Sequence, residues 1–347
     1  MSERTSHPSQ IIGGMFGLED FRELPDQPLP YLQGKHILLT NARSGIRLLV
    51  EQLRPANVWM PSYLCSSMIQ AVNPAVSRIR FYEVDYDLEI PSLEWLESVQ
   101  AGDLVICIAY FGFPILSGLV NAAMERAAWV LEDNVQALLS LNHDPDAHFQ
   151  LYSLRKFFGV PDGAILAATD PGFEFSSQLS PPPSRWWMQA LNASLLRREF
   201  DRIGGERDWF RIANLVDSAA PLSPHRMSEL SELILRYRID YQSISARRIA
   251  NYQTLLERLE HLALFPSLPG GVVPLGFPVR LADRDRVRQR LFDQQIYPPV
   301  HWDIRRYVPE SFQSSHRLSR DILTLVCDQR YDEEDMCRTA AIVRGME

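Results

Sequence analysis

The sequence predicts an α/β protein with a mostly parallel central sheet, and three observations lead to this prediction. From about residue 36 onward, short apolar runs alternate with amphipathic stretches, as in a sheet whose strands are joined by helices. Apolar residues in the first of these stretches, Ile46, Leu49, Val50 and Leu53, recur at helical spacing. The chain has 347 residues, more than a single hydrophobic core usually supports, so a second domain is expected.

The larger domain is expected to span residues 1–250 and to begin with an N-terminal arm. Its predicted strands are His36–Leu39, Asn57–Met60, Arg78–Tyr82, Leu104–Ala109 and Ala128–Glu132, followed by Leu151–Leu154 and Ala164–Ala168. Helices are predicted between them at Gly45–Leu53, Ser62–Val72 and Pro91–Val99, with Pro91 in a first turn.

In the second half of the chain the alternation of predicted strands and helices is interrupted. Pro181, Pro182 and Pro183 exclude a regular helix or inner strand over residues 178–185, which we expect to form an exposed excursion. A long helix is predicted from about Arg226 towards Leu259. Beyond it, a smaller α+β domain is expected over residues 251–347, with a strand at Gly276–Leu281, a helix at Asp283–Gln294 and a final helix from Asp332.

Composition narrows the classes of function. The net charge is −8 and no run of Lys or Arg occurs, which argues against nucleic acid or an anionic membrane as the main partner. No stretch approaches the roughly 20 apolar residues of a membrane span, and the polar N-terminus lacks the pattern of a secretory signal, so a cytoplasmic protein is expected. The four cysteines are scattered, and we expect no metal site. Small-molecule chemistry is favoured.

Lysine is almost absent, which limits the candidates for an amine nucleophile. Of the 35 basic residues, 33 are arginine, and only Lys35 and Lys156 have an amine that could form a Schiff base. Lys35 precedes the first predicted strand, at the end opposite the expected ligand crevice. Lys156 is followed by Phe157 and Phe158, and apolar surroundings make an amine more nucleophilic. The alternative is an ordinary surface lysine in a loop.

Two further segments follow predicted strands at the edge where parallel sheets bind ligands. Asp133 lies directly after an apolar run, and its carboxylate could pair with the protonated ring nitrogen of pyridoxal phosphate; the alternative is a helix N-cap. Residues 41–45 lead into a helix whose N-terminus could hold a phosphate, although an ordinary cap would have the same pattern. Neither a G-x-G-x-x-G motif nor a Walker loop occurs, which counts against a tightly held nicotinamide or ATP.

Taken together, these segments resemble the DegT/DnrJ/EryC1/StrS group of fold-type I pyridoxal-phosphate aminotransferases, nearly from end to end. The segments that resemble the family's motifs are Ala42-Arg43-Ser44-Gly45, Met60-Pro61-Ser62-Tyr63-Leu64-Cys65, Glu132-Asp133-Asn134-Val135-Gln136 and Ser153-Leu154-Arg155-Lys156. Ile12-Gly13-Gly14 and the His301-Trp302 pair resemble a branch found among surface-polysaccharide genes.

The resemblance implies a role for each matching residue. Lys156 would form the Schiff base, Asp133 would bind the ring nitrogen, and Gln136 would lie near the phenolic oxygen of the cofactor. The remaining residues expected near the cofactor are Arg43, Ser44, Tyr63, Cys65 and Ser153. Residues expected to reach the substrate are Tyr110, His301, Trp302 and Arg330, although Arg330 could instead pair with Asp328.

Three positions depart from the family pattern. Ser153 stands three residues before the lysine, whereas better-known members place their phosphate-binding serine about five residues before it. Cys65 stands where many members have an aromatic ring against the cofactor, a role open to Tyr63 or Tyr110. Pro224 stands about where members lend an asparagine across their dimer.

The resemblance implies transamination from an amino acid, glutamate among the candidates, to a keto sugar carried on a nucleotide. It also implies a homodimer. The family's dehydrating branch replaces the lysine by histidine, and the lysine retained here favours transamination. Two alternatives remain open: a pyridoxal-phosphate enzyme acting on a substrate other than a sugar, and a non-catalytic binding protein with the same fold.

Overall fold

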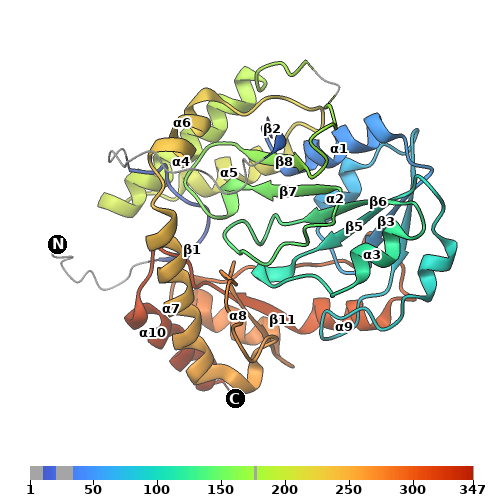
Figure 1. Ribbon diagram of the computed structural model, residues 1–347. Helices are drawn as coiled ribbons and strands as arrows, with labels where there is room; N and C mark the ends of the chain where they lie inside the picture. Colours follow the sequence, from blue (N-terminus) through green and yellow to red (C-terminus); the bar gives the residue numbers. More distant parts are fainter. Residues whose placement is uncertain (1–10, 21–33, 176–177, 347) are drawn as a thin grey trace.

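The computed structural model describes residues 11–20, 34–175 and 178–346. Its centre is a seven-stranded sheet in the order β2-β8-β7-β6-β5-β3-β4 (Figure 1). The strands are β2 (Lys35–Leu39), β3 (Asn57–Pro61), β4 (Arg78–Tyr82), β5 (Leu104–Ile108), β6 (Trp129–Asp133), β7 (Phe149–Ser153) and β8 (Ala164–Ala168). All neighbours from β4 to β7 are parallel, whereas β8 runs antiparallel to both β7 and β2. The predicted α/β class with a mostly parallel sheet is confirmed.

The helices of the first half differ from prediction at several places: the first begins at Ala42 rather than Gly45, and a helix at Leu119–Met124 was not predicted. The elements are α1 (Ala42–Leu53), α2 (Ser66–Ala71), α3 (Leu119–Met124) and the short 3₁₀ segments η2 (Glu94–Ser98), η3 (Tyr110–Gly112) and η4 (Leu154–Lys156). The predicted helix Pro91–Val99 was wrong, since only a 3₁₀ segment forms and Pro91 precedes it. Helix α2 begins four residues later than predicted, because Ser62 extends the pairing of β3 with β4: its N–H donates to the Tyr82 carbonyl at 2.8 Å and its Oγ accepts from the Val84 N–H at 2.9 Å.

The Pro-rich stretch leads into an antiparallel pair of helices, α4 (Ser184–Ile203) and α5 (Asp208–Ser218). Most of residues 178–185 are exposed, as predicted, although the last two already belong to α4. The single long helix predicted after Arg226 is two helices, α6 (Glu229–Tyr237) and α7 (Tyr241–Leu259). The break occurs because the Asp240 side chain accepts from the Ser243 N–H and caps a new helix.

The C-terminal part contains a two-stranded antiparallel sheet of β9 (Phe277–Arg280) and β11 (Ile322–Leu325). Around it lie η5 (Glu260–Leu262), α8 (Arg284–Asp293), α9 (Gln313–Asp321) and α10 (Glu333–Arg344). Helix α7 packs against α10, and the domain boundary proposed at residue 250 falls inside α7. Strand β1 (Ile12–Gly13) pairs in parallel with β10 (Ile296–Tyr297), so the N-terminal segment also contacts this part.

The core lies around the central sheet, and β5 and β8 are buried along their whole length. A separate buried cluster surrounds Phe157 and Phe158 and includes Leu18 from the N-terminal segment. The described part of the chain has no helix with both the length and the apolar character needed to span a bilayer.

Candidate active site

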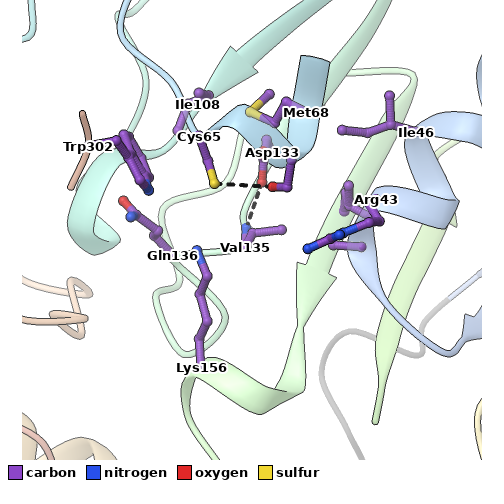
Figure 2. Close-up of a pocket in the computed structure, with 13 residues that line it drawn as sticks. Arg43, Ile46, Cys65, Met68, Ile108, Asp133, Val135, Gln136, Lys156 and Trp302 are labelled. Atoms are coloured by element: carbon purple, nitrogen blue, oxygen red, sulfur yellow. Dashed lines mark hydrogen bonds between the residues drawn. The ribbon is translucent and has the colours of Figure 1, made fainter. Parts of the chain in front are cut away.

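A pocket lies at the carboxyl ends of β5, β6 and β7, where a parallel sheet is expected to bind ligands (Figure 2). Helix α1 and the start of α2 form one side of it, and the loop after β10 reaches it from the C-terminal part. Its walls are formed by Ala42, Arg43, Ile46, Cys65, Ser67, Met68, Ile108, Asp133, Val135, Gln136, Leu151, Lys156 and Trp302.

The pocket brings together half of the residues that the sequence singled out. Those that line it are Arg43, Cys65, Asp133, Gln136, Lys156 and Trp302. Six others do not line it: Ser44, Tyr63, Tyr110, Ser153, His301 and Arg330. The apolar wall residues, such as Ile108 and Leu151, were not foreseen, because an apolar side chain in a buried strand has no distinguishing chemistry in a sequence.

Lys156 ends the short turn η4 between β7 and β8, and its backbone is held firmly on both sides. The Leu154 N–H donates to the Gly163 carbonyl at 3.1 Å, and Phe157 and Phe158, both fully buried, anchor the following residues. Among the described residues, no hydrogen bond or ion pair engages the Lys156 amine. Lys35 instead pairs with Glu174, and in the sheet it lies opposite Ala168.

Asp133 is the last residue of β6 and is 5% exposed. Burial raises the pKa of its carboxyl to about 6, against the opposing effects of the Val135 N–H, which donates to Oδ1 at 3.0 Å, and of the positive charge of Lys156. Turns rather than a helix follow it, so the N-cap alternative does not apply. In Figure 2 Asp133 lies across the pocket from Lys156.

Gln136 presents an amide group to the pocket. The residue is 2% exposed, and its Oε1 accepts from the Phe111 N–H at 2.8 Å. Phe111 adopts a left-handed backbone conformation with φ of 55°, which turns its N–H toward the glutamine. Within the described residues the Gln136 Nε2 has no acceptor although it is buried. A buried donor without a partner is costly, so this group is suited to an oxygen of a bound ligand.

The start of α1 contributes Arg43 rather than Ser44. Asn41 caps the helix, accepting from the Ser44 N–H at 3.0 Å, and the Ser44 Oγ donates back to the Asn41 carbonyl at 2.7 Å. The predicted role of Ser44 at a cofactor therefore has no support from its position, whereas the capping alternative is realised. The Arg43 guanidinium extends into the pocket (Figure 2), and burial lowers its pKa.

The two tyrosines considered for ring stacking are buried behind the pocket. Tyr63 and Tyr110 pack against each other with ring centroids 6.0 Å apart, and the Tyr110 hydroxyl donates to the Tyr63 carbonyl. Both contact Trp302, at 5.5 and 6.3 Å between centroids. Of these three aromatic rings, only that of Trp302 reaches the pocket.

His301 lies beside Trp302, and its Nδ1 is 2.9 Å from the Thr324 hydroxyl. Burial, together with the positive charge of Lys156, lowers the pKa of His301 to about 3, so the imidazole is neutral at physiological pH. Its ring also contacts the edge of Phe111, at 5.8 Å between centroids. His301 thus packs between residues that form or support the pocket wall.

Arg330 holds the N-terminal segment. Its guanidinium pairs with Asp328 at 2.8 Å, donates to the carbonyls of Gly14 and Met15, and lies over the Phe16 ring at 4.1 Å. The ion-pair alternative considered for Arg330 is therefore present in the structure, and its proposed contact with substrate remains a prediction.

In the described ranges 11–20, 34–175 and 178–346, no three or more His, Cys, Asp or Glu side chains gather in a way that could hold a metal ion. The polar groups that line the pocket are an amine, a buried acid, an amide and a guanidinium, together with the Cys65 thiol and the Ser67 hydroxyl.

Solved structures of other proteins match this fold, whereas sequence comparisons find no relative. No protein-family model matches the sequence, and no curated protein sequence matches it significantly. Among solved structures, S. venezuelae DesV in complex with a ketimine intermediate matches with a TM-score of 0.65 and 18% identity, covering 91% of this chain and 86% of DesV. A DegT DnrJ EryC1 StrS aminotransferase from Brucella abortus matches with a TM-score of 0.60 and 15% identity, covering 91% and 87%.

Spr1654 from Streptococcus pneumoniae, named as a sugar aminotransferase, matches in its PMP form with a TM-score of 0.65 and 13% identity, covering 91% of this chain and 88% of Spr1654. A PLP form of the same protein also matches. The chain therefore has the fold of the fold-type I aminotransferases that its motifs resemble.

Proposed function

We propose that the protein is a pyridoxal-phosphate-dependent aminotransferase that moves an amino group from an amino acid such as glutamate to a keto sugar carried on a nucleotide. The observation that carries this proposal is the arrangement of four polar side chains around one pocket. Lys156 and Asp133 lie on opposite sides, and Gln136 and Arg43 lie on the two remaining sides (Figure 2).

This arrangement fits the cofactor group by group. In pyridoxal phosphate the ring nitrogen is opposite the aldehyde-bearing carbon, and the phenolic oxygen and the phosphate arm flank that carbon. We assign Asp133 to the nitrogen, Lys156 to the aldehyde, and the unpartnered Nε2 of Gln136 to the phenolic oxygen; their positions around the pocket support this assignment. Arg43 lies on the side left for the phosphate.

When bound, the cofactor supplies an electron sink for negative charge that develops on the substrate carbon. Asp133 would keep the ring nitrogen protonated, because burial raises the pKa of its carboxyl only to about 6, which leaves the carboxyl ionised at neutral pH. Once free, the Lys156 amine would take the proton from the amino-bearing carbon of the donor and deliver it, across the joining nitrogen, to the carbon that had carried the aldehyde of the cofactor. The same residue therefore serves as base and acid in both halves of the reaction.

The substrate part of the proposal rests on the resemblance and on the sugar aminotransferases among structures of the same fold. The wall of the pocket contributed by Trp302 offers a flat apolar surface against which a sugar ring could pack. We further propose that the protein forms a homodimer and acts in the cytoplasm, in the synthesis of amino sugars or surface polysaccharide.

The test is the visible spectrum of the purified protein with added pyridoxal phosphate, recorded beside Lys156→Ala. We expect an absorption band in the wild type that borohydride fixes to the chain and that an amino donor removes. If wild type and variant both stay colourless, the proposal fails and a binding protein with this fold is left. A panel of keto sugars and simple keto acids then separates the sugar substrate from other acceptors.

A further inference from the structure

Two of the polar groups expected around the cofactor phosphate do not stand at their expected positions in this chain. The position five residues before the lysine is Leu151, and this leucine lines the pocket, whereas Ser153 does not. Pro224 occupies the region from which an asparagine was expected to cross to the partner subunit. A doubly charged phosphate would therefore lack two of its expected hydrogen-bond donors.

One cationic side chain is positioned to replace them. Among the residues that line the pocket, only Arg43 and Lys156 carry a positive charge. The proposed function assigns Lys156 to the aldehyde of the cofactor. Arg43 is the second residue of α1, so its own N–H and that of Ala42 have no partner within the helix. The positive end of the helix dipole therefore reinforces the guanidinium on this side of the pocket.

The C-terminal end of α5 anchors the Arg43 side chain through a hydrogen bond. The Arg43 Nη1 donates to the Asp217 carbonyl at 3.3 Å, and Asp217 lies in the last turn of α5, where the dipole favours a cation. The Asp217 carboxylate in turn pairs at 3.0 Å with Arg155, the residue next to Lys156. A single residue of α5 thus connects the start of α1 with the lysine turn.

We propose that Arg43, anchored by Asp217 of α5, binds the cofactor phosphate, so that this chain builds its phosphate site within one subunit. The inference rests on the proposed function and specifies how that site holds its cofactor. A guanidinium suits this role because its planar fork can donate two parallel hydrogen bonds to phosphate oxygens.

Binding of pyridoxal phosphate and of pyridoxal, which lacks the phosphate, tests the proposal directly. Both affinities are measured from the absorption band for wild type, Arg43→Gln, Arg43→Lys and the control Arg47→Gln. Arg47 lies one turn further along α1, pairs with Glu51 and is not among the residues that line the pocket. Melting curves confirm that each variant folds.

We expect Arg43→Gln to weaken the affinity for pyridoxal phosphate roughly 10- to 100-fold, as for loss of hydrogen bonds to a charged group, while the affinity for pyridoxal hardly changes. Arg43→Lys should recover part of the loss, and Arg47→Gln should match wild type. Equal losses for both aldehydes would overturn the proposal. So would an unchanged preference for the phosphate together with a raised KM for the amino donor, which would assign Arg43 to the donor carboxylate.

Subunit mixing tests whether the site is built within one chain. Arg43→Gln and Lys156→Ala chains are denatured together and refolded as a mixture. If Arg43 acted across a dimer, the Arg43→Gln chain would regain tight binding from its partner in mixed dimers. We expect no such recovery, and a tightly binding fraction would overturn the single-subunit site. Failure of wild type to form a band with either aldehyde would instead refute the proposed function itself.

Discussion

The backbone of Gly17 passes so close to Gly159 that a Cβ on Gly159 would lie 1.8 Å from the Gly17 carbonyl oxygen. Two hydrogen bonds fix this approach: the Glu19 N–H donates to the Gly159 carbonyl at 2.9 Å, and the Gly159 N–H donates to the Glu19 carboxylate at 2.8 Å. Gly159 lies three residues after Lys156. The N-terminal segment therefore fixes the loop that follows the proposed catalytic lysine.

Gly159→Ala is expected to separate these two segments. The added methyl group meets backbone rather than a flexible side chain, so we expect a loss of about 3 kcal/mol in the free energy of unfolding, measured by chemical denaturation. The matched control is Gly270→Ala, because the corresponding Cβ would meet nothing within 4 Å; its effect should stay below about 1 kcal/mol. Equal stabilities of the two variants would contradict the close approach.

The two lysines should behave differently when replaced. Lys156→Ala is expected to abolish the visible band and to lower transamination at least about 100-fold, because the amine proposed to attach the cofactor and transfer the proton is lost. Lys35→Ala removes a surface ion pair with Glu174 and should leave both the band and the rate close to wild type. Loss of activity in Lys35→Ala with retention in Lys156→Ala would reverse the assignment.

Asp133 should make the ligand-free protein less stable at higher pH. Its folded pKa of about 6 lies above the ordinary value of 3.8, so the folded state holds the proton more tightly, and stability from this group falls as the pH rises between about 4 and 6. Asp133→Asn removes the buried charge and is expected to be more stable than wild type above pH 6, by on the order of 3 kcal/mol. The difference should vanish below pH 4, as judged by urea titrations; a gap that does not depend on pH would contradict this assignment.

The same carboxyl predicts the pH dependence of cofactor binding. Below pH 6 Asp133 becomes protonated and can no longer pair as an anion with the ring nitrogen, so the affinity of the wild type should fall as the pH drops through about 6. Asp133→Asn should bind more weakly and lack this step. Affinities measured by absorption between pH 5 and 8 check it, and an identical profile for both proteins would exclude Asp133 from the ring nitrogen.

Gln136→Leu should affect stability and cofactor binding together. The Phe111 N–H loses its acceptor and remains buried, so a cost of about 1 to 3 kcal/mol in the free energy of unfolding is expected. Gln136→Glu retains an acceptor for this N–H but has no amide donor for the pocket. At a pH where it is ionised, it should therefore keep the hydrogen bond from Phe111 but bind the cofactor weakly; at a pH where it is protonated, its O–H can donate, and part of the affinity should return. Wild-type affinity of the ionised variant would show that the Nε2 has no partner in the cofactor.

Most of the architecture could be predicted from the sequence, because buried strands and their turns leave strong local patterns. Strands β4 and β8 have the predicted bounds, and the other strands of the central sheet differ by one or two residues. The direction of β8 could not be predicted, since a buried strand has the same apolar run in either direction. Helix breaks such as that at Asp240 were also missed, because the apolar spacing continues through them.

The site residues that could be predicted are those that combine a distinctive functional group with a recognisable place in the sequence. Lys156 is one of only two amines, and Asp133 and Gln136 follow a strand end within a recognisable motif. The role of Asp217 was not predictable, because its contact with Arg43 uses a backbone carbonyl brought from a distant helix. Trp302 was foreseen near the substrate, but its packing against Tyr63 and Tyr110 depends on how the C-terminal part meets the sheet.

The scarcity of lysine makes the chemistry directly observable by nuclear magnetic resonance. A chain labelled with ¹⁵N-lysine has two side-chain nitrogens, one in a surface ion pair on β2 and one in the pocket. The Lys35 nitrogen serves as an internal reference that no ligand in the pocket touches. Under the proposed function, the second resonance would report the attachment state of Lys156 through a complete turnover, without a mutation or an added chromophore.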